Sequence, residues 1–277
     1  MIKDIILHLE RDASRDAVRD FAISTAETFA AHLTGVSEAF TAMVPNYILP
    51  DFPANILADL LAESETAARS AIERFEATAK RSGVSAEARL ILQSDFGPPR
   101  TFSEAARHFD LSVIMQSDDD RGFNNDLLIE ATLFDSGRPL IVVPYTERSG
   151  LKLDRIVCCW DGSRAAARAI NDALPLLRKA NGVELFIVAN EKTADEQVLR
   201  GADIARHLAR HDVKVEVETT PAADVDVANV ILSHVADCSA SLLVMGGYGH
   251  SRLREFVLGG ATRGILATMT VPVFISH

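Results

Sequence analysis

The sequence predicts an α/β fold built as two doubly wound, open parallel sheets of five strands each. With 277 residues, the chain exceeds the usual size of one compact domain. Short apolar, β-branched runs alternate with segments of helical periodicity, and this alternation favours parallel strands joined by right-handed crossovers. The same order of elements then occurs a second time, which indicates a tandem repeat with domains at residues 1–147 and 152–277.

The first repeat opens with a strand at residues 3–9, because this run is short, apolar and rich in β-branched side chains. Asp12 then offers a side chain that can cap the helix expected over residues 14–31, whose apolar residues recur at helical spacing. Turn-forming residues over 43–51 indicate a loop without regular secondary structure. The other expected elements are strands at 32–36, 86–92, 111–115 and 138–144, and helices at 55–81 and 101–109.

The second repeat follows a seam at residues 146–154 and shows the same succession. In open sheets of this kind, ligands bind at the carboxyl ends of the strands, where the strand order reverses. Residues that directly follow a strand are therefore the first candidates for a functional site. The expected strands are 156–160, 183–188, 213–217, 241–245 and 271–275, and the expected helices are 163–179, 195–211, 225–238 and a last one that opens at residue 261.

The composition is that of a globular protein, with 48% hydrophobic and 24% charged residues and a net charge of -11. An acidic surface repels the phosphates of nucleic acids and of anionic lipids, so neither a nucleic acid nor a membrane is expected as a partner. The N-terminus lacks the features of a secretory signal, and no apolar run reaches membrane-spanning length. A cytoplasmic location is therefore expected.

Metal sites and disulfides are not expected. Three cysteines are too few for a disulfide framework and lack the paired spacing of a zinc site. Cys158 and Cys159 are neighbours in a strand, so their side chains point to opposite faces and cannot hold one metal together. His207 and His211 are four residues apart on a helix, but no metalloprotease glutamate accompanies them, so they are expected to be solvated. Catalytic residues are not expected either.

Two glycine turns near the C-terminus form the most specific motif. Gly246 and Gly249 follow the fourth strand of the second repeat, and nine residues later Gly259 and Gly260 precede the last helix at Ala261. Glycine lets backbone N–H groups approach a phosphate without an intervening Cβ, and a helix start adds unpaired donors and a positive dipole end. In isolation, the simpler interpretation is that these glycines end a strand and cap a helix.

The spacing Gly-x2-Gly-x9-Gly between a buried strand and the closing helix resembles the nucleotide-binding signature of the universal stress protein family. The resemblance extends over residues 5–144 and 156–275 and is strongest over 244–273. It implies a five-stranded fold of the adenine nucleotide alpha hydrolase type. It also implies a stress-related regulatory protein that binds ATP, or ADP or AMP, with Mg²⁺ as an optional companion. Any catalysis would be slow ATP hydrolysis.

The resemblance assigns ligand contacts residue by residue. Asp161 matches the family's acidic residue near adenosine, and Val188 matches the position whose backbone meets adenine. Asp-Gly-Ser is also ordinary turn chemistry, so a turn or cap role for Asp161 stays open. The phosphate-binding segments match residues 245–249 and 259–262, which adds Met245, Gly246, Gly249, Gly259, Gly260, Ala261 and Thr262 to the expected site.

Two departures from the family pattern affect this expectation. Members that bind ATP have Ser or Thr where this chain has Gly260, so a hydrogen bond of about 1 kcal/mol to a phosphate is lost, with Thr262 as a partial substitute. In the first repeat, the acidic run 118–120 stands in place of the glycines, and Glu10 in place of Asp161. Carboxylates repel a polyphosphate, so the first repeat is expected to be a structural or regulatory mate.

The strands at 139–143 and 272–275 begin with proline, which suits strand starts and sheet edges. By the resemblance, these two strands are expected to pair within one chain as an intramolecular pseudo-dimer, and association into a homodimer is a further expectation. One alternative is a nucleotide-free scaffold that acts through protein–protein contacts. Another, an ATP pyrophosphatase, would need Ser-Gly-Gly-x-Asp-Ser after a first strand, and residues 161–163 are not that motif.

Overall fold

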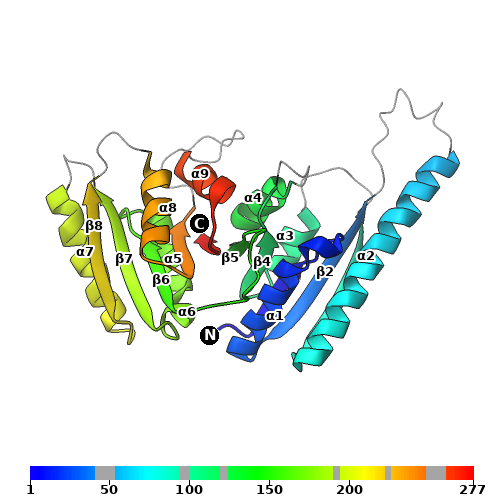
Figure 1. Ribbon diagram of the computed structural model, residues 1–277, viewed down its shortest axis with the longest axis horizontal. Helices are drawn as coiled ribbons and strands as arrows, with labels where there is room; N and C mark the ends of the chain where they lie inside the picture. Colours follow the sequence, from blue (N-terminus) through cyan, green and yellow to red (C-terminus); the bar gives the residue numbers. More distant parts are fainter. Residues whose placement is uncertain (41–53, 94–99, 119–123, 190–193, 222–225, 248–259) are drawn as a thin grey trace.

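Within the residues that the structure describes, ten strands form one continuous sheet with helices on both faces (Figure 1). The structure is a computed structural model, and it describes residues 1–40, 54–93, 100–118, 124–189, 194–221, 226–247 and 260–277. The strand order is β3-β2-β1-β4-β5-β10-β9-β6-β7-β8. The predicted α/β class with parallel strands is confirmed.

The N-terminal half contributes five parallel strands, with β1 in the middle because it pairs with both β2 and β4. A short 3-10 turn, η1, follows β1, and Asp12 caps it by accepting a hydrogen bond from the Ser14 N–H. The α-helix that was expected from residue 14 with Asp12 as its cap begins at Ala17 instead. The elements are β1 (Asp4–His8), η1 (Ala13–Arg15), α1 (Ala17–Phe29), β2 (His32–Phe40), α2 (Ala54–Ser82), β3 (Ala86–Gln93), α3 (Arg100–Ala106), β4 (Leu111–Met115), α4 (Asp126–Asp135) and β5 (Leu140–Val143).

The C-terminal half repeats this arrangement, with β6 between β7 and β9. Its first helix begins where predicted, because the Ser163 hydroxyl accepts a hydrogen bond from the Ala166 N–H. The elements are β6 (Arg155–Cys159), α5 (Arg164–Asp172), α6 (Leu174–Leu177), β7 (Gly182–Ala189), α7 (Ala194–Ala209), β8 (Val215–Pro221), α8 (Val227–Asp237), β9 (Leu242–Gly246), α9 (Gly260–Thr268) and β10 (Val273–Ser276).

The two halves are joined by β5 and β10, which pair antiparallel with Phe274 opposite Ile141. The two sheets expected from the sequence are therefore one hydrogen-bonded sheet. The proline-initiated strands, which the sequence placed at sheet edges, lie in its middle. Side chains support this junction, since the Gln116 amide donates hydrogen bonds to the carbonyls of Leu266 (2.8 Å) and Ala267 (3.2 Å) at the end of α9.

Each face of the sheet carries a core that continues across the junction. Ile141 and Phe274 belong to one core, while Leu140 and Ile275 belong to the other, as the two-residue period of a strand requires. Among the described residues, no helix has the length and apolar character needed to cross a membrane.

The adjacent cysteines follow the same rule. Cys158 lies in one core and Cys159 packs against the other, which confirms that they point to opposite faces. Burial raises the pKa of the Cys158 thiol well above its usual range. Burial, and to a smaller extent the charge of Asp161, raises the pKa of Cys159 to about 12. These shifts favour the protonated form of both thiols, which is the less reactive one.

Candidate functional site

The strand order of the C-terminal half reverses between β6 and β9. After β6 the chain moves to β7 on one side, and the later β9 pairs on the other side, with Val244 opposite Cys158. The carboxyl ends of these three strands carry Asp161, Val188 and Met245. Three predicted site residues from distant parts of the sequence thus lie at one edge of the sheet, at its topological switch point.

Asp161 has the turn role that its sequence context allowed. One oxygen of its carboxylate accepts a hydrogen bond from the Ser163 N–H at 2.8 Å, across Gly162, whose φ is +77°. The side chain is exposed. An ionised carboxylate has acceptor sites for several hydrogen bonds, so this turn leaves it able to accept one from a ligand hydroxyl or amine.

Val188 and Met245 differ in what they can offer a ligand. Val188 is half-buried in β7 and pairs with Thr220 of β8, so it belongs to the rim of the sheet. Met245 is 5% exposed and packs in the core beneath this edge. Any contribution of Met245 to a ligand therefore comes from its backbone.

Gly246 is required by packing. A Cβ at this position would lie 2.4 Å from the Ala165 carbonyl carbon and 2.4 Å from the Ala166 nitrogen, so β9 runs directly against the first turn of α5. This supports the simpler interpretation of the first glycine turn. Gly249 and Gly259, the other predicted glycines of the motif, lie outside the described residues.

The first turn of α9 is open and contains no acidic residue. Gly260 begins this helix and is exposed, and a Cβ added there would meet no atom of the described residues within 4 Å. Ala261 is half-buried and Thr262 is 4% exposed. The burial of Thr262 argues against the prediction that its hydroxyl substitutes for the one missing at Gly260.

The corresponding helix start in the N-terminal half is closed by the protein's own side chains. The Asn125 N–H donates to the Ser117 hydroxyl at 2.9 Å, and the Asp126 N–H donates to the Asn124 side chain at 2.8 Å. Asp126 places a carboxylate in the first turn of α4. Glu10, which is 6% exposed, accepts a hydrogen bond from the Asn125 side chain at 3.1 Å. Asp119 and Asp120 lie outside the described residues.

A buried charged cluster lies beside this closed helix start. His8 ends β1, with its Nδ1 3.4 Å from Glu10 Oε1 and its Nε2 3.9 Å from Glu38 Oε2, and its ring meets Phe102 edge-on. Burial of the ring lowers the pKa of His8. The hydrogen bond to Glu10 and the charges of Glu10 and Glu38 together outweigh burial and raise the pKa of His8 above its usual value.

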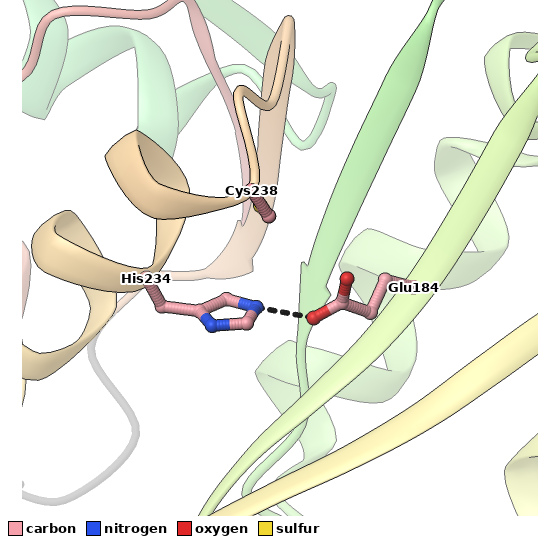
Figure 2. Close-up of side chains that lie close together, drawn as sticks. All are labelled: Glu184, His234 and Cys238. Atoms are coloured by element: carbon pink, nitrogen blue, oxygen red, sulfur yellow. Dashed lines mark hydrogen bonds and ion pairs between the residues drawn. The ribbon is translucent and has the colours of Figure 1, made fainter.

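A second polar cluster, which the sequence did not predict, joins Glu184, His234 and Cys238 (Figure 2). His234 and Cys238 are four residues apart at the end of α8, and this spacing was a readable signal for one helix face. Glu184 comes from β7, and its proximity depends on tertiary packing, which no sequence pattern indicates. His207 and His211, by contrast, lie with their ring centroids 4.6 Å apart and contact Asn171 and Arg178.

Comparison with known proteins agrees with this architecture. Residues 152–277 match the model of the universal stress protein family. A universal stress protein from Synechocystis sp. is 28% identical over 138 residues, which is 49% of this chain and 46% of that protein. The chain thus spans about half the length of this relative.

Solved structures resemble the whole chain. A universal stress protein from Archaeoglobus fulgidus DSM 4304 has a TM-score of 0.72 at 16% identity, over 99% of this chain and 97% of its own. A functionally unknown protein from Pseudomonas aeruginosa PAO1 has a TM-score of 0.61 at 16% identity, over 99% and 92%. Another Archaeoglobus fulgidus universal stress protein, solved in complex with dAMP, covers 51% of this chain and 98% of its own at 15% identity, with a TM-score of 0.34.

The two likenesses with TM-scores of 0.72 and 0.61 establish the fold of the complete chain, and the family match covers its C-terminal half. The N-terminal half, which the family match does not cover, has the same order of elements and belongs to the same ten-stranded sheet. Residues 152–277 therefore form a domain of the universal stress protein family, and the N-terminal half repeats the same α/β element order.

Proposed function

We propose that this chain is a stress-related regulatory protein that binds ATP or a related adenine nucleotide in its C-terminal half, residues 152–277. In this proposal, residues 1–147 form a structural or regulatory domain that does not bind nucleotide. The contrast between the two corresponding helix starts carries the proposal. The start of α9 is exposed and free of acidic residues, whereas the start of α4 is hydrogen-bonded by its own side chains and carries Asp126.

The phosphates of the nucleotide would lie at the start of α9. Unpaired N–H groups and the positive dipole end make a helix start favourable for anions, and Gly260 presents its backbone without a side chain. Gly249 and Gly259 are proposed as further backbone contacts, and Mg²⁺ as an optional companion of the phosphates.

The adenosine would lie across the ends of β6 and β7. The exposed carboxylate of Asp161 can accept a hydrogen bond from a ribose hydroxyl, and the backbone at Val188 can meet the edge of the base. This edge of the sheet is the switch point at which open α/β sheets bind their ligands. The nucleotide would act by changing the conformation or the partner choice of the protein, with at most slow ATP hydrolysis.

The proposal is tested by titrating the full chain with a fluorescent ATP analogue. Gly260→Asp adds a carboxylate where the phosphates would bind, so the dissociation constant should rise at least about tenfold through like-charge repulsion. The substitution leaves the fold intact, because the site is open and an acidic residue suits a helix start.

Leu127→Asp is the matched control, since Leu127 is 55% exposed in the first turn of α4. It should bind the analogue like the wild type. The proposal fails if wild-type protein does not bind at millimolar nucleotide, or if both variants bind as tightly as the wild type.

The second candidate is a nucleotide-free scaffold that recognises a protein partner. The closed site of the N-terminal half favours it, because Glu10 and Asn125 already fill one of the two family sites. The scaffold predicts no adenine nucleotide among the small molecules that co-purify with the gently isolated protein, whereas the first candidate predicts one in mass spectra. Association into a homodimer is proposed for either candidate and can be measured by light scattering.

A further inference from the structure

Three chemically different metal-ligating groups converge between α8 and β7. Glu184 offers a carboxylate oxygen from β7, His234 an imidazole nitrogen from α8, and Cys238 a sulfur from the residue that caps α8. One ligand atom of each lies within 4.8 Å of the others, and Figure 2 shows the side chains grouped between the helix and the strand. Glu184 is 4% exposed, which sets this cluster apart from an ordinary surface group of acidic residues.

Neighbouring residues already hold two of these side chains in place. The His234 ring stacks on Phe186, with centroids 3.9 Å apart and planes at 4°. The Oε2 oxygen of Glu184 accepts a hydrogen bond from Arg155 at 2.7 Å, while Oε1 faces His234 Nε2 in direct contact. Outer contacts of this kind fix the orientation of metal ligands in known sites.

We propose that Glu184, His234 and Cys238 bind one divalent transition-metal ion of the zinc class. Zinc is held by Cys sulfur, His nitrogen and carboxylate oxygen at about 2.0–2.3 Å in a tetrahedron, which sets ligand atoms about 3.3–3.8 Å apart. The ion would open the direct contact between Glu184 and His234 and draw the Cys238 sulfur inward. A fourth position would remain for water or for another ligand.

This site is separate from the proposed nucleotide site in both chemistry and position. Glu184 lies near the start of β7 and Arg155 begins β6, so the cluster is near the amino ends of the strands, whereas Asp161 follows their carboxyl ends. Mg²⁺ prefers oxygen ligands, so a sulfur and nitrogen site would not hold the companion ion of a nucleotide. The proposal therefore stands without the nucleotide.

The test uses the full chain after removal of metals by a chelator. Titration with Zn²⁺ in a calorimeter should show one saturable site, and Co²⁺ should give the near-ultraviolet absorption band of a thiolate–cobalt bond. Cys238→Ser should abolish this band and weaken Zn²⁺ binding at least about tenfold. It conserves shape at a half-buried position, so the metal-free variant should unfold at the same temperature as the metal-free wild type.

Two controls make the result specific. Cys159→Ser should keep the cobalt band, because Cys159 ends β6 and is not among the three residues whose ligand atoms come together. The double variant His207→Gln, His211→Gln removes the other close histidine pair and should bind Zn²⁺ like the wild type. Absence of Zn²⁺ binding at millimolar concentration, a cobalt band that persists in Cys238→Ser, or loss of binding in either control would each overturn the proposal.

Discussion

Gly260 is the residue at which the sequence departs from the expected pattern of universal stress proteins that bind ATP, which have Ser or Thr at this position. Nothing lies within 4 Å of a Cβ added there, so the glycine is not required by packing among the described residues. A hydroxyl could therefore be added without a clash. A hydroxyl at position 260 would provide a hydrogen-bond donor for a phosphate. The hydroxyl of Thr262 cannot readily take this role, because Thr262 is 4% exposed.

We accordingly expect Gly260→Ser to bind nucleotide more tightly than the wild type. One additional hydrogen bond of about 1 kcal/mol corresponds to a roughly fivefold lower dissociation constant. Fluorescence titration of both proteins measures this ratio, and Gly260→Ala is the control because it adds the Cβ without the hydroxyl. Equal affinity of the serine and alanine variants would show that the phosphates do not lie beside this residue.

His8 makes folding stability depend on pH. Its folded pKa is raised by Glu10 and Glu38 against the opposing effect of burial, so the protonated ring favours the folded state. The stabilisation by protonated His8 is fully present below the pKa of about 6.5 that the ring has in the unfolded chain. It is lost as the pH rises through the higher pKa of the folded state.

The stability difference between wild type and His8→Gln should therefore be larger at about pH 6 than at about pH 9. Urea unfolding at both pH values measures it, with His108→Gln as the control because His108 is exposed. A difference that grows toward alkaline pH would contradict the ion-pair account of this cluster.

At the scale of elements, the approach of β9 to α5 sets the shape of the C-terminal site. Gly246 lies against the backbone of Ala165 and Ala166, and these cannot move without displacing the start of α5. That start also includes Ser163 and the turn at Asp161. A side chain at position 246 would consequently disturb both sides of the switch point.

Gly246→Ala should destabilise the protein by about 1–3 kcal/mol, through overpacking against backbone atoms. Gly260→Ala, in contrast, should be neutral or stabilising by about 0.4–1 kcal/mol, because its Cβ enters open space. Thermal unfolding of the two variants in the absence of nucleotide compares them. Equal midpoints would mean that β9 and α5 do not pack as described.

The elements themselves were largely predictable from the sequence. The amphipathic run expected over 55–81 is α2 (Ala54–Ser82), and the helix expected from residue 163 begins there as α5, because periodicity and capping are local properties. Three features were not predictable: the packing role of Gly246, the burial of Thr262 and the meeting of Glu184 with His234. Each depends on which distant segments come into contact, and local patterns do not contain that information.

At the scale of the whole molecule, the pairing of β5 with β10 unites two copies of one unit. The repeat predicted two sheets, whereas the cores on both faces run across the junction without a break. The family resemblance, and not the initial prolines, predicted that these two strands pair within one chain, and they do. Local patterns alone do not predict this pairing, because each copy is complete in its pattern without the other.

We expect the two halves to unfold together. Trp160 is the only tryptophan and reports on the C-terminal half, while circular dichroism in the far ultraviolet reports on both halves. In urea, the two signals should give the same midpoint and the same slope, because the shared sheet and cores couple the halves. A second transition seen only by circular dichroism would show that the halves are energetically independent.

The antiparallel junction also determines how a bound ligand can act at a distance. Many two-unit proteins respond to ligands by hinge closure, in which one unit swings relative to the other. Here a swing would break the backbone hydrogen bonds between β5 and β10. Binding in the C-terminal half must therefore act through altered helix positions or sheet twist. Gln116, which follows β4 and donates hydrogen bonds to carbonyls at the end of α9, is one side chain that links the two halves.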